Sequence, residues 1–110
     1  MTNTTETDID ILVPAEKTGK ASATDILLAG ADALDDRAAQ RDQPDGERSM
    51  LRTVGAFNIL TGHALTEADG WLLMSVLKMA RSRGGRHVLD DYIDGAAYVA
   101  LAGEVAEKST

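Results

Sequence analysis

Apolar residues gather in one stretch of the chain, which covers residues 66–83 and reads TEADGWLLMSVLKMARSR. Within residues 71–80 the apolar run is interrupted only by Ser75 and Lys78. A helix that is apolar on nearly every side is typical of a buried helix rather than a surface helix. The stretch therefore predicts a core helix that contains Trp71 and around which the rest of the chain packs.

Three weaker helical patterns flank this stretch and cover about residues 25–40, 47–61 and 89–107. Each pattern repeats apolar residues at intervals of three and four positions, as one face of a helix does. The positions expected to face inward are Ile26, Leu27, Ala31 and Leu34, then Met50, Leu51, Val54, Phe57 and Leu60, then Ile93, Ala97, Tyr98, Ala100, Leu101 and Val105.

Local signals mark where these helices begin and end. Thr24 is a candidate N-cap for the first helix, and Gly62 is placed to end the second. Thr66, with Asp69 three residues later, resembles a capping box at the start of the core helix. The connections are therefore expected to be short.

The patterns define the fold class. No internal repeat and no strand-type alternation is found beside them. We expect an all-α protein, with a four-helix bundle-like domain over residues 23–110 whose neighbouring helices are mostly antiparallel. Residues 1–22 are rich in Thr, Ser and Lys around one short apolar group, which predicts a flexible N-terminal arm.

Composition narrows the classes of function. The 110 residues include no cysteine, so disulfide frameworks and thiolate metal sites are excluded. The net charge of −7 argues against binding to a nucleic-acid backbone. No apolar run approaches the length of a membrane span, and the first ten residues lack the pattern of a secretory signal, so we expect a cytoplasmic protein. A core with few aromatic residues favours completion by a second copy, and hence a homo-oligomer.

Lys78 is the anomaly in the core helix, because a buried charge is rarely tolerated without a partner. The core helix and the last helix should form a hairpin about Arg86, in which residues equidistant from the turn lie level. Lys78 is then level with Asp94. By the same count Arg81 is level with Asp91, so the sequence predicts two ion pairs that cross the hairpin.

Two interpretations of these ion pairs stay open. In the first they are structural and fix the register of the hairpin. In the second they mark a site, because carboxylates three apart on one helix face, here Asp91 and Asp94, can hold a divalent cation such as Mg²⁺.

A nearby cation on the facing helix, Lys78 or Arg81, would then contact phosphate groups. Tyr98 continues the acidic stripe and joins Lys78 and Arg81 as a candidate nucleotide-binding residue. Two acids are few for a cation, so the second helix is expected to add Glu47, or the first helix Asp35 or Asp36.

The residues also resemble a known group of proteins. The matching elements are DRAAQRDQPDGERSM, LTEADGWLLMSVLKMAR and DDYIDGAAYVALAGE, which lie within the segment from Asp36 to Glu104. They are similar to small phage- and prophage-encoded proteins of unassigned function, which look like distant relatives of the all-α nucleotide pyrophosphohydrolases of the MazG and dimeric dUTPase type.

This resemblance implies a helical oligomer that binds magnesium and splits nucleoside triphosphates into a monophosphate and pyrophosphate. Asp91 and Asp94 match the spacing of that family's later acidic motif, Glu-x-x-Asp. The family's earlier motif, Glu-Glu-x-x-Glu, is absent from this chain. The expected cofactor is therefore Mg²⁺, whereas catalysis is left open.

Three functions follow. The first is a phage or prophage nucleotide-binding protein on a pyrophosphohydrolase-like scaffold, with or without magnesium-dependent hydrolysis, in the host cytoplasm. The second is a noncatalytic homo-oligomeric module that sequesters a nucleotide signal or a host protein during infection. The third is a structural interaction protein in which the ion pairs only clasp the hairpin.

Overall fold

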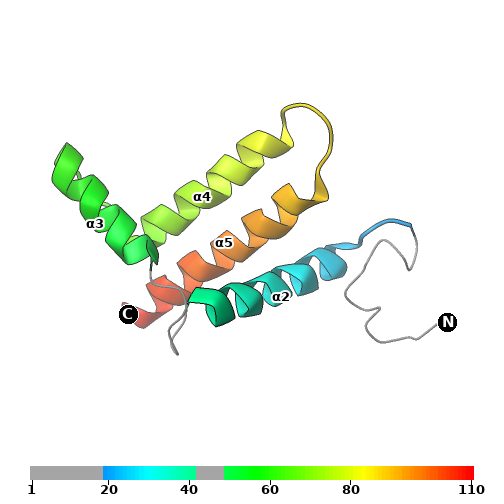
Figure 1. Cartoon of the computed structure of the whole chain (residues 1–110), viewed down its shortest axis with the longest axis horizontal. Helices are drawn as coiled ribbons and strands as arrows, with labels where there is room; N and C mark the ends of the chain where they lie inside the picture. Colours follow the sequence, from blue (N-terminus) through cyan, green and yellow to red (C-terminus); the bar gives the residue numbers. More distant parts are fainter. Residues whose placement is uncertain (1–18, 42–48) are drawn as a thin grey trace.

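The computed structural model describes residues 19–41 and 49–110, and these residues form four helices without a strand. The helices are α2 (Ala23–Arg41), α3 (Ser49–Thr61), α4 (Glu67–Ser82) and α5 (Leu89–Lys108). In Figure 1, α4 and α5 form an antiparallel hairpin, α2 packs on α5, and α3 lies at the beginning of α4. The predicted all-α four-helix bundle is therefore confirmed.

Small residues bring α4 and α5 together. Ser75 is 1% exposed, and its Oγ donates a hydrogen bond of 3.1 Å to the carbonyl oxygen of Gly95. A Cβ atom placed on Gly95 would lie only 3.6 Å from the Cβ atom of Lys78, so the two helices are nearly in backbone contact here. The predicted core residue Trp71 is buried in the same interface, where it packs with Ala102.

The capping signals are confirmed at α4 and corrected at α2. Thr66 and Asp69 exchange two hydrogen bonds, of 2.8 Å and 3.1 Å, and so form a complete capping box. At α2 the same exchange joins Ser22 and Asp25, at 3.0 Å in both directions. The prediction that Thr24 is the N-cap is therefore wrong, because the hydroxyl two residues earlier reaches the backbone N–H of Asp25.

Only one side of α3 touches the hairpin. Met50 and Val54 pack on Gly70, where any side chain would collide with them. The Asn58 side chain fixes the connection to α4, because it bonds both the N–H and the carbonyl group of Leu65, at 2.9 Å and 3.0 Å. The prediction that Leu51, Phe57 and Leu60 also face inward is wrong, since all three are exposed.

The prediction of a buried α4 is wrong for half of its circumference. The side that faces α5 is buried, as Trp71 and Ser75 show, but the opposite side is open. The exposed large apolar residues on α4 are Leu72, Leu73, Val76, Leu77 and Met79. The apolar pattern identified the helix, but among the described residues no element covers its outer face.

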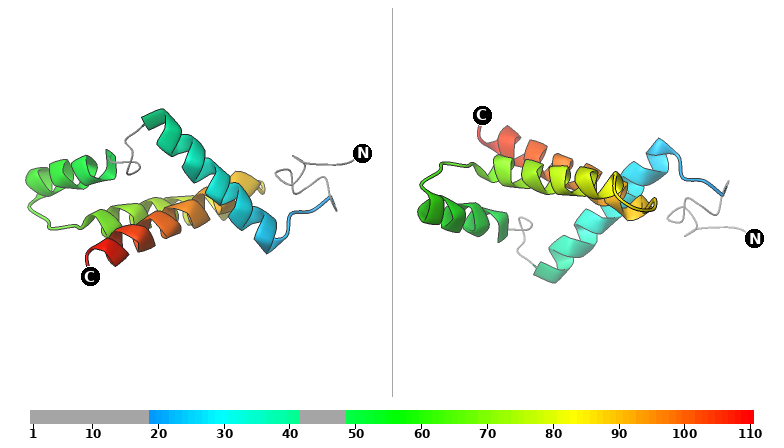
Figure 2. Two further views of the ribbon diagram at one scale, coloured as in Figure 1. Left: turned by 90° about the horizontal axis from the view of Figure 1, so that it is seen from below. Right: turned by 90° about the horizontal axis from the view of Figure 1, so that it is seen from above.

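α2 crosses the outer side of α5, as the two views in Figure 2 show. The crossing is close at Gly30, where an added Cβ atom would lie 3.5 Å from the carbonyl oxygen of Ile93 and 3.9 Å from Ala97. Farther along, the Arg37 guanidinium lies 5.4 Å from the centre of the Tyr98 ring. Leu27 and Ala31 were expected to face inward and are exposed instead, because α2 contacts α5 through the side of the helix that contains Gly30.

Two expectations concern residues that the structure does not describe. Most of the predicted N-terminal arm lies in residues 1–18, and the candidate ligand Glu47 lies in residues 42–48. None of the helices in the described part of the chain is long and apolar enough to cross a membrane.

Candidate functional site

Lys78 and Asp94 form the ion pair that the hairpin register predicts. The Lys78 Nζ atom lies 3.0 Å from Asp94 Oδ2, and the two side chains are 15% and 21% exposed. Lys78 projects from the α5-facing side of α4, three residues after the buried Ser75. The lysine in the apolar run is therefore neutralised across the helix interface.

The second predicted ion pair does not form. Asp91 is buried against α4, whereas Arg81 is exposed, and no ion pair joins them in the described part of the chain. Successive residues are about 100° apart around a helix, so Arg81 is turned about 60° away from Lys78. That rotation carries Arg81 out of the interface and into solvent.

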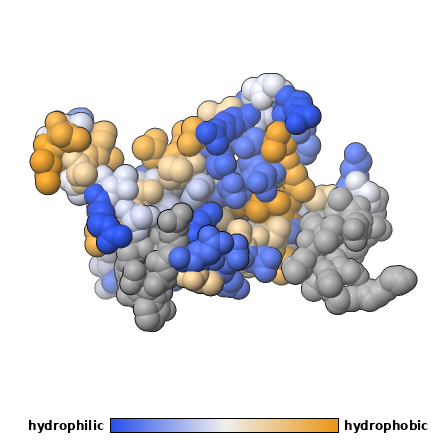
Figure 3. Space-filling model, in the orientation of Figure 1, coloured by the Kyte–Doolittle hydropathy of each residue, from blue (hydrophilic) through white to orange (hydrophobic). Residues whose placement is uncertain are grey.

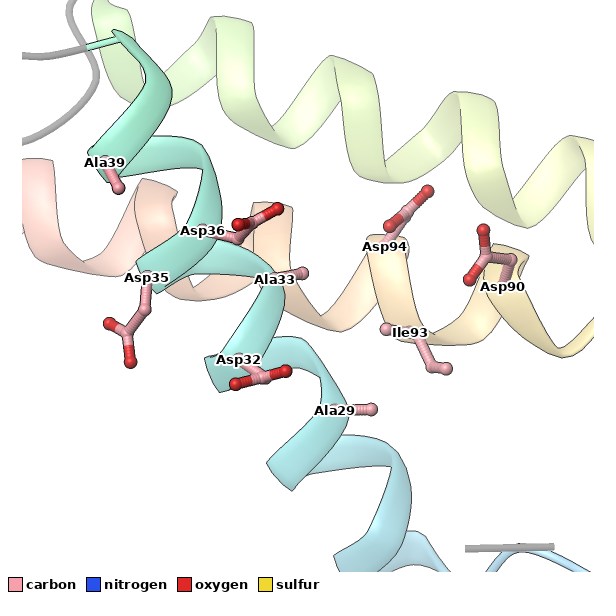
Figure 4. Close-up of a pocket in the computed structure, with 9 residues that line it drawn as sticks. All are labelled: Ala29, Asp32, Ala33, Asp35, Asp36, Ala39, Asp90, Ile93 and Asp94. Carbon is pink, nitrogen blue, oxygen red and sulfur yellow. The ribbon is translucent and has the colours of Figure 1, made fainter. Parts of the chain in front are cut away.

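A cleft between α2 and α5 gathers acidic side chains on one side of this ion pair. Its volume is about 600 Å³. The carboxylates that line it are Asp32, Asp35 and Asp36 from α2 and Asp90 and Asp94 from α5. Figure 4 shows that Asp36 points toward α5, whereas Asp35 points away from it. Asp94 points toward α4, where it meets Lys78, so Asp36 and Asp94 line the same cleft from its two helices without facing each other directly.

The charge of the cleft favours cationic ligands. Its lining includes five aspartates and no lysine or arginine, and the remaining lining residues are Ala29, Ala33, Ala39 and Ile93. A cleft lined by one sign of charge concentrates ions of the opposite sign. Carboxylate oxygens suit Mg²⁺, which keeps several of its waters and is held by one or two carboxylates together with substrate phosphates.

The structure separates the acids that the sequence paired. Asp94 lines the α2–α5 cleft, but Asp91 lines a smaller groove of about 220 Å³ between α4 and α5, next to Lys78. No three acidic or histidine side chains in residues 19–41 and 49–110 are grouped so that they could hold a metal ion. A cation bound to the described residues would therefore need further ligands from water or from a bound molecule.

Two side chains pack against the ring of Tyr98. Trp71 stacks on it with ring centres 5.7 Å apart and ring planes 18° apart, and Arg37 lies over it. These contacts tie α4, α5 and α2 together at one point. The predicted role of Tyr98 in nucleotide binding stays a prediction, and the contacts give the ring a packing role as well.

The sequence named Asp35 and Asp36 as candidate additional acids for the site, but it could not place them. Helix spacing fixes which residues share a face of one helix, not which faces of two distant helices meet. Gly30 was the available signal, since a glycine in a helix interior costs stability and often marks a close helix contact. Its contact with α5 brings the α2 aspartates beside Asp94.

Comparison with protein families gives one result. The chain belongs to the family described as "Domain of unknown function (DUF6378)", whose profile matches residues 27–106 and so includes most of α2, α3, α4 and α5. A search of curated proteins found no match, and neither did a search of solved structures. The expected likeness to phage proteins and to MazG-type pyrophosphohydrolases is not among these findings and stays a prediction.

Proposed function

We propose that this protein binds a nucleotide as its magnesium complex, in the acidic cleft between α2 and α5. The proposal rests on one observation, which is that negative carboxylates and a positive ammonium group lie next to each other at this cleft. Five aspartates line the cleft, and one of them, Asp94, holds the ammonium group of Lys78 at 3.0 Å. An acidic cleft repels a bare phosphate, so the aspartates would bind the nucleotide only through a Mg²⁺ ion that bridges a carboxylate and the phosphate oxygens.

The roles of the residues follow from their positions. Asp36 and Asp94 would hold the hydrated cation, because one carboxylate from each helix is enough when the phosphates supply further ligands. Lys78 would contact a phosphate oxygen as a charged hydrogen-bond donor. The resemblance to nucleotide pyrophosphohydrolases supports the same ligand class, and the resemblance to phage proteins supports a location in the cytoplasm of a phage-infected or prophage-carrying host.

Binding without turnover is the second candidate, and two observations favour it. The earlier acidic motif of the pyrophosphohydrolases is absent from the sequence. Among the described residues no group of three acids is arranged to hold a metal ion. A protein of this kind would sequester a nucleotide signal or a host protein rather than hydrolyse a nucleotide.

Titration calorimetry with a panel of deoxynucleoside triphosphates, with magnesium and then with a chelator, tests the proposal. We expect heat of binding only when magnesium is present. Asp36→Asn should weaken binding by about 10-fold, which corresponds to one lost charged contact. The control Glu104→Gln removes an exposed acid of α5 that does not line the cleft, and it should leave the affinity within about twofold.

Pyrophosphate release, measured on the same samples, separates the two candidates. Release above background, lost in Asp36→Asn, supports a hydrolase. Binding with release at background supports the sequestering module. Absence of binding for every nucleotide, or equal binding with the chelator, would overturn the proposal for this cleft.

A further inference from the structure

The outer face of α4 carries a regular row of exposed residues. At about 3.6 residues per turn, positions spaced by three and four align along one side of a helix. On α4 and its C-cap these positions are Asp69, Leu72, Val76, Met79 and Arg83, all of them exposed; we call this row the α4 seam. Val76 is at its centre and is 56% exposed, and Leu73 lies beside it at 60%.

The α4 seam is apolar in the middle and charged only at its ends. Asp69 stands at the first turn of α4 and Arg83 at the C-cap, so the two end charges have opposite sign. The interior of the row has the spacing of a coiled-coil contact over two heptads. A helix with this pattern on one side and a packed core on the other is suited to bind a second helix.

We propose that the α4 seam binds the same seam of a second copy of this chain, with the two helices antiparallel and centred on Val76. A two-fold axis at Val76 places two residues opposite each other when they lie equally far from Val76 on its two sides. Val76 then meets its own counterpart, Leu73 meets Met79, and Asp69 meets Arg83. Leu72 meets Ala80, so each apolar residue opposes an apolar residue, and the Asp69–Arg83 ion pair forms twice.

Charge argues for a second copy in this orientation. A parallel pair would place Asp69 on Asp69 and Arg83 on Arg83, and like charges across an interface are costly. The chain carries a net charge of −7, yet the α4 seam carries one acid and one base, so the face itself adds nothing to the repulsion between two acidic molecules. The contact is isologous, as in most homodimers.

The neighbouring helix enlarges the apolar surface. On α3, Ile59 and Leu60 are 85% and 84% exposed. In Figure 3 the hydrophobic side chains gather over α3, at the left of the view, and continue along α4. A stable interface buries about 800 Å² on each partner, which is more than a two-heptad seam offers, so α3 is expected to flank the contact.

Single cysteines provide a direct test, because the natural chain contains none. A disulfide needs Cβ atoms about 3.8 Å apart. In the antiparallel dimer only the central residue lies next to its own counterpart, so Val76→Cys should form a covalent dimer upon oxidation. Leu72→Cys should not, since four residues on each side of the centre separate the two copies by about 12 Å. Equal cross-linking of both variants would indicate a parallel pair and overturn the proposal.

Mass measurement tests the face itself. Sedimentation of the full chain between about 1 and 100 µM should show a species of twice 11.7 kDa. Leu73→Glu should raise the dimer dissociation constant by about 100-fold, whereas Leu27→Glu on α2, where the leucine is 63% exposed, should change it less than twofold. A monomeric natural chain, or dissociation by Leu27→Glu and not by Leu73→Glu, would overturn the proposal.

The end charges test the register. Arg83→Glu should raise the dissociation constant by about 10-fold at low salt, with a smaller effect at high salt, because it places a second acid on Asp69. Arg86→Glu makes the same change of charge three residues farther on, outside the α4 seam, and should have little effect. Equal effects of the two variants would contradict the pairing of Asp69 with Arg83. Circular dichroism of each variant checks that the fold is kept.

Discussion

Lys78 and Asp94 join α4 to α5 by a 3.0 Å ion pair that is largely shielded from water. The pair stands beside the close contact of Ser75 with Gly95, and Asp94 also lines the α2–α5 cleft. One residue therefore takes part in the helix interface and in the candidate site. Substitutions at this pair separate a structural role from a binding role.

Removal of the charge on Asp94 is expected to destabilise the protein. Asp94→Asn leaves the Lys78 ammonium without its counter-charge in the interface, which should cost about 1–3 kcal/mol of unfolding free energy. The control Arg81→Met removes an exposed cation and should change stability by less than about 0.5 kcal/mol. Urea denaturation of both variants measures the difference. Equal stabilities would show that the ion pair contributes nothing.

The same variant distinguishes the functions. If Asp94 only clasps the hairpin, Asp94→Asn lowers stability and leaves the affinity for magnesium-nucleotide unchanged. If Asp94 holds the cation, the affinity falls as well. The proposed function requires the second result, and a loss of stability alone would favour the structural interpretation.

The buried hydroxyl of Ser75 is expected to contribute to the contact between α4 and α5. Ser75→Ala removes its hydrogen bond to Gly95 and should lower the unfolding free energy by about 1 kcal/mol. Ser82 makes an exposed bond of 2.7 Å to Met79 within its own helix, so Ser82→Ala should cost less. Thermal denaturation of the two variants provides the comparison. A larger loss for Ser82→Ala would contradict the account of this interface.

Two glycines should respond in opposite ways to alanine. Gly55 has open space around it within α3, so Gly55→Ala should stabilise the protein by about 0.5–1 kcal/mol through helix propensity. Gly70 lies under Met50 and Val54, so Gly70→Ala should displace α3 and cost about 1–3 kcal/mol. Unfolding in urea measures both changes. Stabilisation by Gly70→Ala would show that α3 does not depend on this contact.

The sequence predicted what depends on local spacing. The capping box at Thr66, the end of α3 at Gly62 and the register that pairs Lys78 with Asp94 all follow from short-range rules, and the structure confirms them. The apolar run of α4 identified a helix but not the element that packs on its outer face. Hydrophobicity does not tell which part of this chain, or which other molecule, buries a side chain. Residues such as Val76 were therefore expected in the core and are exposed.

The candidate site was predicted less completely. The sequence named Asp94 and proposed Asp36 among several additional acids, but only the crossing at Gly30 shows that the two helices face each other. Asp91 was paired with Asp94 because the two are three residues apart, yet they line different hollows. A spacing of three leaves about 60° between side chains, enough to place them on the two sides of a helix contact.

The most direct test of the central claim is nuclear magnetic resonance of the ¹⁵N-labelled chain, titrated with magnesium and a deoxynucleoside triphosphate. We expect the amide signals of residues 32–39 and 90–94 to shift in a saturable manner, and only when magnesium is present. Asp36→Asn should reduce these shifts, and Glu104→Gln should not. Shifts confined to α3 or to other residues outside the cleft, or no shift with any nucleotide, would contradict the claim.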